Sequence, residues 1–455
     1  MSTPDYSSKG DLTTGPVKKH LVRLTVPMIW GILAIVSFQL VDTWYISMLG
    51  TAELAAISFT FPVTYILFSL VLAQGIAASS VLSRLIGQGN RSRIKRVTTH
   101  SLLFAFLSGI VFAAIGLLTM KPLFRAMGAG PEMMPIISDY MTIWFAGSIF
   151  LTIPMVGNSG IRATGDTMTP AMIMTTAAVM NALIAPVLVF GLFGMPRLEV
   201  QGAAIATLLA NIGTTIAALY VLYYKKRLIS RSRLHMKLFN NSVKRLMVIT
   251  IPVSVATIMP PVLGTIITAL LAQHGTASVA AFGIASRVEA FAFVIIMALS
   301  TGMAPIIGQN WGAKLYPRVH ETLNAAIRFS VIWSMMVAVL LIAFAGPIAR
   351  AFTTDPQIIH ETMLYFWIIP VTYGLGNLVQ GWSSAFNAIG KPKQSFMMMA
   401  IKLIALTIPA AMAGSYFGGT KGIFIALAAV NVVTGIAFHI INRRLCQRYE
   451  LAEQS

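Results

Sequence analysis

Twelve apolar stretches of membrane-crossing length constrain this chain more than any other feature of its sequence. A helix needs about 20 apolar residues to cross the hydrocarbon core of a bilayer, and each stretch has about that length or more. The chain is 56% hydrophobic and only 10% charged, a composition outside the range of soluble domains. We therefore predict an all-α integral membrane protein. The predicted spans are residues 22–48, 55–83, 98–122, 133–157, 168–194, 202–224, 246–273, 279–307, 322–349, 358–386, 394–416 and 420–441.

The basic residues predict the orientation of these spans. Of the 33 Lys and Arg residues, 27 lie in, or toward, the alternate segments that begin with the N-terminal tail, five lie in or beside the opposite loops, and Arg287 lies within a span. Because cytoplasmic loops carry the excess of cations, both termini are expected in the cytoplasm, with the chain in a bacterial-type inner membrane. The same asymmetry accounts for the net charge of +19 without a nucleic-acid partner. The first apolar stretch is too long for a signal-peptide core and is predicted to be an uncleaved span.

The two halves of the sequence repeat one another. Residues 50–52 recur at 275–277, and Pro27 recurs as Pro252, at one offset of 225 residues. Each half holds six predicted spans, an even number, so we expect two pseudo-symmetric six-helix bundles of the same orientation around a central cleft. The predicted organisation is a cytoplasmic N-terminal tail (1–21), an N-terminal bundle (22–224), a basic cytoplasmic linker (225–245), a C-terminal bundle (246–441) and a cytoplasmic tail (442–455).

Asp42 is a carboxylate inside the first predicted span. It lies about five to eight residues from the far end of the span, or about 8–12 Å deep at 1.5 Å per residue. An ionisable group at this depth usually faces a cavity or a partner, which makes it a functional candidate. An acid at the membrane interface near a helix end is the plainer alternative. Pro27, on the same predicted helix, removes a backbone hydrogen bond and offers a hinge, so the span has the parts of a switch.

Motifs of common enzyme classes are missing from the sequence. There is no Gly-x-x-x-x-Gly-Lys-Ser/Thr loop for ATP, no His-x-x-x-His or His-Glu-x-x-His pair for a metal, and no Gly-x-Ser-x-Gly elbow. The single cysteine, Cys446, lies in the basic C-terminal tail, and we take it to exclude a disulfide framework and any cysteine-based metal site. We therefore predict a protein that is not an enzyme and that carries no cofactor.

Several short motifs stand in a fixed order within the duplicated frame. They are Pro27 with Val41-Asp42-Thr43, the segment Leu49–Ala56, the segment Arg162–Thr167 and the segment Pro305–Ala313. In this order they resemble the multidrug and toxic compound extrusion (MATE) family, and the likeness covers all twelve spans. The resemblance implies a secondary antiporter that exports amphipathic, often cationic compounds from a V-shaped cleft in exchange for protons or sodium. It also implies that the carboxylate of the first span, here Asp42, binds the coupling cation.

The fifth span bears on the choice of coupling ion. In one branch of the family an Asn-x-x-x-Asp-Pro pattern joins the cation site, whereas here Asn181 is present and Ala185 replaces the acid. A sodium ion prefers several hard oxygen ligands and a compensating charge, whereas a proton needs one acid. The departure favours proton coupling. Sodium binding at Asp42 stays open, with Asn181, Gln39 and Thr207 as further ligands.

The resemblance also directs attention to residues that are able to contact exported molecules. Glu289 lies about a dozen residues inside the eighth span. It is a candidate contact for a cationic compound or a second protonation site, and the alternative is a structural ion pair or hydrogen bond between helices. Aromatic and methionine side chains accommodate varied apolar shapes, which makes Tyr45, Tyr65, Met297 and Tyr373 candidates, although each also suits simple packing. We expect the partners to be drugs, dyes or toxins and the lipid bilayer, and we expect a monomer.

Two other classes of protein fit parts of the pattern. A lipid-linked precursor flippase of the same superfamily, or a major facilitator, shares the parallel halves, but such flippases tend to have more spans and a cationic cavity. A membrane scaffold or channel is the alternative outside the carriers, in which Asp42 would only hold helices together. Loss of transport with normal folding in Asp42→Asn would reject that alternative.

Overall fold

The computed structural model describes residues 11–230 and 233–454, and all regular secondary structure in these ranges is helical. Residues 1–10 of the predicted N-terminal tail, 231–232 of the predicted linker and 455 of the C-terminal tail lie outside the described residues. The α-helices are α1 (Val17–Ser47), α2 (Thr51–Gly87), α3 (Arg91–Ala126), α4 (Met133–Ala146), α5 (Ile149–Ala163), α6 (Met168–Phe190), α7 (Glu199–Tyr220), α8 (Met236–Ala272), α9 (Thr276–Gly312), α10 (Tyr316–Ala343), α11 (Ala345–Phe352), α12 (Pro356–Ile368), α13 (Tyr373–Ala388), α14 (Pro392–Ala400) and α15 (Ile408–Gln454). Short 3₁₀ segments are η1 (Leu192–Gly194) and η3 (Pro370–Thr372), and π-helical segments are η2 (Val221–Lys225) and η4 (Ile401–Thr407).

The helices supply the twelve spans that the apolar stretches predict. Within the described ranges, ten helical segments are long and apolar enough to cross a bilayer, and the bent pair of α4 and α5 makes an eleventh. The segment Pro392–Gln454 contains two predicted spans, because Gly419 leaves helical geometry at φ +58° and ψ −142° and divides it. The all-helical membrane fold is therefore confirmed. The twelfth span is counted separately only when the helical segment Pro392–Gln454 is divided at Gly419.

Three predicted spans are broken in a way that hydropathy does not reveal. The stretch 133–157 bends by 45° between α4 and α5. The stretch 358–386 passes through the 3₁₀ turn η3, where Pro370 lacks a backbone N–H. The stretch 322–349 ends α10 at Ala343 and continues as the short α11. Since both arms of each break are apolar, composition alone reads them as one helix.

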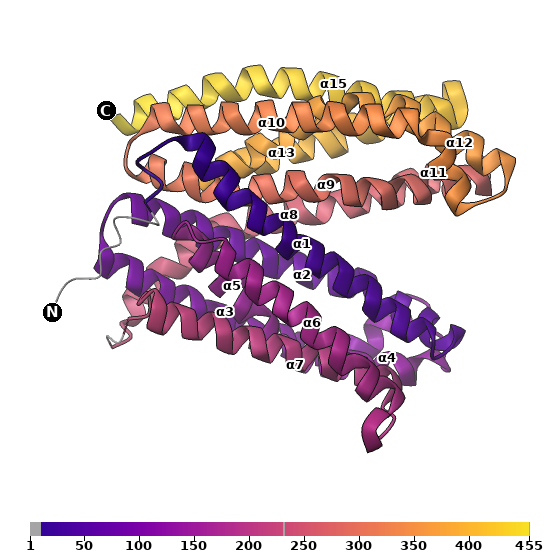
Figure 1. Cartoon of the computed structure of the whole chain (residues 1–455), viewed down its shortest axis with the longest axis horizontal. Helices are drawn as coiled ribbons and strands as arrows, with labels where there is room; N and C mark the ends of the chain where they lie inside the picture. The colour runs from indigo at the N-terminus through magenta and orange to yellow at the C-terminus, as the bar shows by residue number, and fades with distance from the viewer. Residues whose placement is uncertain (1–10, 231–232, 455) are drawn as a thin grey trace. The chain divides into compact units, whose positions relative to one another are not determined.

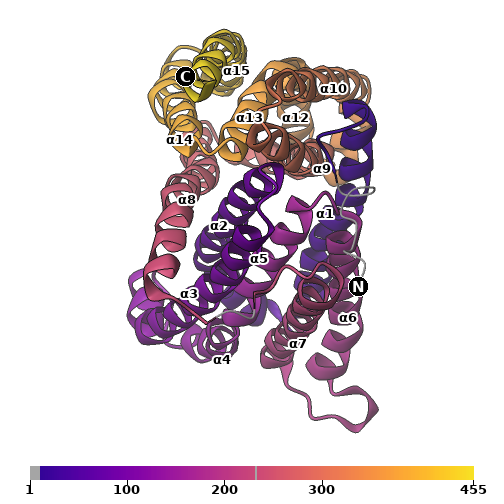
Figure 2. The same ribbon diagram turned by 90° about the vertical axis from the view of Figure 1, so that its left-hand side faces the viewer.

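The chain divides into two compact units. Unit 1 contains the described residues up to Thr14 and Arg23–Ile251, and unit 2 contains Gly15–Val22 and the described residues from Pro252 onward. In unit 1, α5 lies against α2, α3 and α7, while α6 and α7 pair along their length (Figure 1, Figure 2). In unit 2, α13 lies against α9, α10 and α15. Helices α5 and α13 correspond at the offset of 225 residues, so the same repeat element is central to both units.

One close helix crossing also occurs in both units. Gly202 of α7 lies against the backbone of α6, where an added Cβ would come within 2.6 Å of the carbonyl carbon of Leu188. Gly422 lies against the backbone of Gly414, where an added Cβ would come within 2.0 Å of the carbonyl oxygen. A side chain at either position would push the two backbones apart. The crossing of the last two spans of each half therefore depends on glycine.

Candidate functional site

Asp42 lies on α1, five positions before the helix ends at Ser47. Its Oδ1 atom is buried and has no hydrogen-bond partner among residues 11–230 and 233–454. The buried Tyr140 of α4 is close enough to interact with it electrostatically. A buried carboxylate oxygen without a donor is costly, so a proton or a cation bound at this oxygen would lower the free energy of the site.

A second buried oxygen without a donor belongs to Asn181. The Nδ2 atom of Asn181 donates to Oγ1 of Thr207 at 3.2 Å, which joins α6 to α7. The Asn181 side chain is fully buried, and within the described chain its Oδ1 has no partner. The hydroxyl of Tyr45 on α1 donates to the carbonyl of Ala182 at 3.2 Å. Because Tyr45 lies three residues after Asp42, the face of α1 that carries both residues is turned toward α6 beside Asn181.

Gln39 and Pro27 occupy less enclosed positions on α1. The side chain of Gln39 is exposed, and its backbone carbonyl accepts the hydroxyl of Thr43 at 2.8 Å. The structure therefore brings Asn181 and Thr207 together but leaves the amide of Gln39 outside their hydrogen bond. Pro27 lies in the interior of α1, and the helix continues through it. The predicted hinge is thus at a position where one backbone hydrogen bond is missing.

Unit 2 holds Glu289 between two tyrosines. The hydroxyl of Tyr365 donates to Oε1 of Glu289 at 2.7 Å, and the hydroxyl of Tyr373 donates to the same oxygen. Both tyrosines are buried. Sequence reasoning named Glu289 and Tyr373 as separate candidates and found no partner for the acid. The structure supplies that partner as a pair of hydroxyls.

The break at η3 explains how both tyrosines reach one carboxylate. Tyr365 belongs to α12 and Tyr373 begins α13, so the turn between these helices changes the direction of the chain between the two residues. Sequence reasoning missed Tyr365. A signal was present, because Tyr365 is the repeat mate of Tyr140 at the offset of 225 residues, and Tyr140 lies near Asp42. Each unit therefore sets a tyrosine from the corresponding position near its membrane acid.

The other candidate contacts are exposed within their own units. Tyr65 on α2 is 46% exposed and Met297 on α9 is 52% exposed, so neither is fixed by packing. Arg287 is also exposed. Lys402 lies in the π-helical segment η4, and its Nζ donates to the backbone carbonyl of Gly376 at 3.4 Å. Lys402 thus has a backbone partner inside unit 2.

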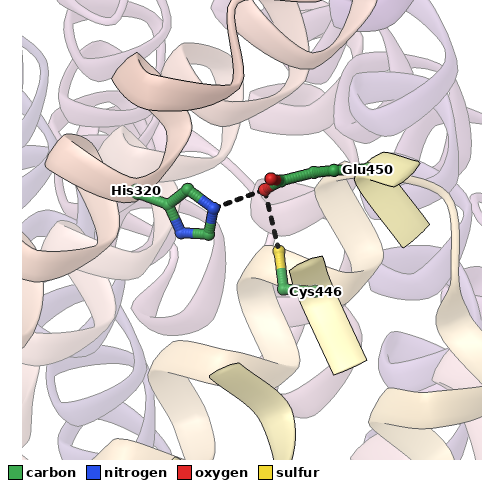
Figure 3. A group of neighbouring side chains, drawn as sticks. All are labelled: His320, Cys446 and Glu450. Carbon is green, nitrogen blue, oxygen red and sulfur yellow. Dashed lines mark hydrogen bonds and ion pairs between the residues drawn. The ribbon is translucent and has the colours of Figure 1, made fainter. Parts of the chain in front are cut away.

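A cluster near the end of α15 contains side chains of metal-ligand type. His320 of α10 forms an ion pair with Glu450 of α15, and Sγ of Cys446 donates to the same Glu450 oxygen at 3.9 Å. Figure 3 shows the imidazole and the thiol converging on that carboxylate, and the three potential ligand atoms lie within 4.8 Å of one another. Imidazole, thiolate and carboxylate are zinc ligands. The cysteine count did not predict that Cys446 lies beside Glu450 and His320. In the described structure the ion pair between His320 and Glu450 connects α10 to α15.

Two repeated units of membrane-spanning helices, each with an acid and a tyrosine inside it, define the class of two-lobed membrane transporters. The family model described as MatE matches residues 27–187 and 252–413, one match in each half. The chain therefore belongs to the MATE family, whose members are membrane transporters and not enzymes. The fold resemblance stated from the sequence is confirmed.

Individual relatives cover nearly the whole chain. It is 37% identical over 436 residues to the FAD transporter of Shewanella oneidensis, covering 96% of each protein. It is 28% identical to the multidrug export protein MepA of Staphylococcus haemolyticus, covering 93% of each. Among solved structures, the Vibrio cholerae MATE transporter VcmN in the bent form superposes with a TM-score of 0.90 at 30% identity, covering 95% of this chain and 98% of that one. These relatives support small-molecule transport across a membrane.

Proposed function

We propose that the protein is a secondary active antiporter that exports amphipathic small molecules in exchange for protons, with Asp42 as the coupling site. The observation that carries the proposal is the buried Oδ1 of Asp42, for which the described residues offer no hydrogen-bond donor. A proton bound there removes the buried charge and supplies the missing hydrogen. Ala185 stands where one branch of the family has a second acid, so the site has one carboxylate instead of two. This agrees with a proton as the coupling ion.

In this mechanism the proton changes what α1 can contact. Ionised Asp42 attracts hydroxyl and amide donors, whereas the protonated form does so less strongly, so the two forms favour different positions of the helix. Pro27 supplies the point at which α1 can bend. A conformer that binds the proton tenfold more tightly is favoured by about 1.4 kcal/mol on protonation. Proton entry would thereby drive release of the exported molecule.

Sodium coupling is the second candidate, and Asn181 favours it. Its buried Oδ1 lacks a donor in the described chain and lies on the helix that α1 faces through Tyr45. Together with Asp42 and Thr207 this oxygen would offer a hard cation three protein ligands. The side chain of Gln39, the fourth predicted ligand, is exposed, so it would have to turn inward to reach a bound sodium ion. A proton therefore fits the site with fewer changes than sodium.

For the exported molecule, Glu289 favours organic cations, including drugs, dyes and toxins. An anionic group in a low-dielectric site attracts a positive charge strongly. The FAD transporter of Shewanella oneidensis, at 37% identity, favours a second candidate, a flavin dinucleotide that carries a diphosphate. In that case Arg287 and Lys402, two cations inside the spans of unit 2, would be the matching charges. In both cases we propose a monomer in a bacterial inner membrane with both termini in the cytoplasm.

Proteoliposomes that contain the purified protein test the coupling. A pH gradient in sodium-free buffer and a sodium gradient at uniform pH are imposed separately, and transport of a fluorescent organic cation and of FAD is followed in each. Proton coupling predicts transport driven by the pH gradient alone. An absolute requirement for sodium would reject it, and movement of neither compound would reject both substrate candidates.

A further inference from the structure

Unit 1 contains a basic pocket with a volume of about 900 Å³ that has no part in the proposed transport mechanism. The residues that line it are Arg91, Ser92, Lys95, Tyr223, Tyr224, Arg227, Ile229 and Ser230. Three of these eight residues are cations, two are tyrosines and none is an acid. We use the name basic pocket for this set below. Its location is the end of the spans α3 and α7 that the distribution of Lys and Arg predicts to face the cytoplasm.

The first wall is the start of α3. Asn90 caps this helix, because its side-chain oxygen accepts the backbone N–H of Arg93 at 3.0 Å. Arg91 and Lys95 are four residues apart and therefore lie on one face of the helix. A helix N-terminus adds partial positive charge from its unpaired N–H groups. The two cations and the helix end thus point the same sign of charge into the pocket.

The second wall is the end of α7 and the chain that follows it. Helix α7 widens into the π-helical segment η2, which carries Tyr223 and Tyr224, and the chain then turns at Arg227. Arg227 has φ +51°, in the left-handed region that is unfavourable for a residue with a side chain. Strain of this kind persists where the surrounding structure enforces it, and it clusters at binding sites.

Several contacts hold the second wall in place. Lys226 forms an ion pair with Asp166 at 2.7 Å, and both side chains are about three-quarters buried, at 24% and 23% exposed. The backbone N–H of Ser230 donates to Oγ1 of Thr99 on α3 at 2.8 Å. Leu228 is only 6% exposed. The wall is therefore fixed to unit 1 on both sides of Arg227, and the pocket is a built feature.

The ion pair also engages Asp166, the acid that contacts the second wall at Lys226. Burial alone would raise the pKa of Asp166, but hydrogen bonds from Lys226 and Thr169, together with the charge of Lys226, hold its pKa below the usual range. Asp166 is therefore ionised at neutral pH and is engaged by Lys226. The eight lining residues of the basic pocket include three cations and no acid, so the pocket would attract an anion that enters it.

We propose that the basic pocket binds the headgroup phosphate of an anionic phospholipid from the cytoplasmic leaflet. Basic pockets between helices at this level of the membrane suit such headgroups. The pocket lies beside the ends of two predicted spans, where we expect the lipid headgroups, and its tyrosines are of the residue types that favour the membrane interface. A soluble phosphate carries the same charge as the headgroup but is not held at the membrane surface. We therefore propose the lipid, and not free phosphate, as the anion in the pocket. Bound lipid would join the start of α3 to the linker after α7.

Native mass spectrometry of the detergent-solubilised protein tests the proposal. Phosphatidylglycerol and phosphatidylcholine are added separately, and inorganic phosphate is added as the soluble competitor. We expect retention of phosphatidylglycerol over phosphatidylcholine. Because each cation near a membrane surface strengthens binding about fivefold, the triple variant Arg91→Ala, Lys95→Ala and Arg227→Ala should bind phosphatidylglycerol about 100-fold more weakly. Equal retention of both lipids would overturn the proposal, as would binding of inorganic phosphate without phosphatidylglycerol.

A matched variant removes the same charge outside the pocket. Lys237→Ala, Lys244→Ala and Arg245→Ala changes three exposed cations of α8 in the same unit, and it should leave phosphatidylglycerol binding within about twofold of the unmodified protein. The single variant Arg227→Gly guards against misfolding, since glycine relieves the left-handed strain while removing the charge. It should keep thermal stability and lose about fivefold in lipid binding. Equal losses in the two triple variants, or unchanged binding in Arg227→Gly, would contradict a site at the basic pocket.

Discussion

The acids of the two units differ in how their oxygens are satisfied. In unit 1, Oδ1 of Asp42 is buried without a donor in the part of the chain that the structure describes. In unit 2, Oε1 of Glu289 accepts the hydroxyls of Tyr365 and Tyr373. A satisfied carboxylate loses hydrogen bonds when its surroundings change, whereas an unsatisfied one gains by binding a proton or an ion. The two units therefore hold their membrane acids in different surroundings, and we expect the two acids to have different chemical tasks.

The supporting tyrosines make the comparison informative. Tyr140 and Tyr365 occupy corresponding positions of the repeat and lie near Asp42 and Glu289. The acids themselves do not correspond, because Asp42 is on the first helix of its half and Glu289 is on the second. The repeat thus places a tyrosine at the same position in each unit. In unit 2, where the acid is on the second helix, this tyrosine donates a hydrogen bond to it, whereas Oδ1 of Asp42 on the first helix of unit 1 receives none from the described residues.

Asp42→Asn should have the largest effect. An amide cannot take up a proton in the working pH range, so transport driven by a pH gradient should fall to the leak of protein-free liposomes. Asp139→Asn is the matched control, because Asp139 is an exposed acid on α4 next to Tyr140. The measurement is transport of a fluorescent cation by proteoliposomes, with normal elution in size-exclusion chromatography as the test of folding. Full pH-driven transport in Asp42→Asn would remove Asp42 from the coupling mechanism.

Glu289→Gln should have the next largest effect, confined to cationic compounds. Opposite charges about 4 Å apart attract by about 4 kcal/mol at an effective dielectric constant near 20, and a third of that changes affinity about tenfold. We therefore expect apparent affinity for an organic cation to fall about tenfold while that for a neutral compound changes little. Glu321→Gln, at an exposed acid of α10, is the control. Equal losses for both compounds would indicate that Glu289 is structural.

The spans and the duplication were predictable because physics restricts them to few patterns. Backbone groups in a bilayer must bond within a helix, so every span leaves a long apolar stretch in the sequence. The break between α4 and α5 and the turn η3 were not predictable, since apolar residues continue across both. The division at Gly419 was predictable only as a gap between two stretches, and its cause is the backbone conformation of one residue.

The sites were predictable as single residues and not as contacts. Depth in a span singled out Asp42 and Glu289, because an acid is costly there wherever its helix faces. The hydrogen bonds from two tyrosine hydroxyls to Glu289 depend on how α9, α12 and α13 are rotated about their axes. Hydropathy cannot predict this rotation when several faces of a helix are apolar. Gln39 shows the converse case: it lies three residues from Asp42 on α1, yet its side chain is exposed.

Tyr365→Phe should have a smaller effect on transport than removal of the acid. It deletes one of two donors to Glu289 and keeps the charge, so we expect a loss of about 2 kcal/mol in stability and only a few-fold weaker binding of an organic cation. The measurements are thermal unfolding in detergent and cation binding. Tyr416→Phe, at a side chain that is 85% exposed, should change neither. A loss of cation binding in Tyr365→Phe as large as that in Glu289→Gln would mean that the hydroxyl, and not the charge, holds the substrate.

Pro27→Ala should have the smallest effect, and it separates the hinge from the proton site. Alanine restores one backbone hydrogen bond in α1 and stiffens the helix at that point, while Asp42 keeps its surroundings. Paired spin labels on α1 and on α2 should report a distance that changes with pH in the unmodified protein, changes less in Pro27→Ala and does not change in Asp42→Asn. Pro252→Ala, the repeat mate on α8, is the matched control and should leave the change intact. If the distances titrate identically in the unmodified protein and in Asp42→Asn, protonation of Asp42 does not move α1, and the difference between the two acids lies in binding alone.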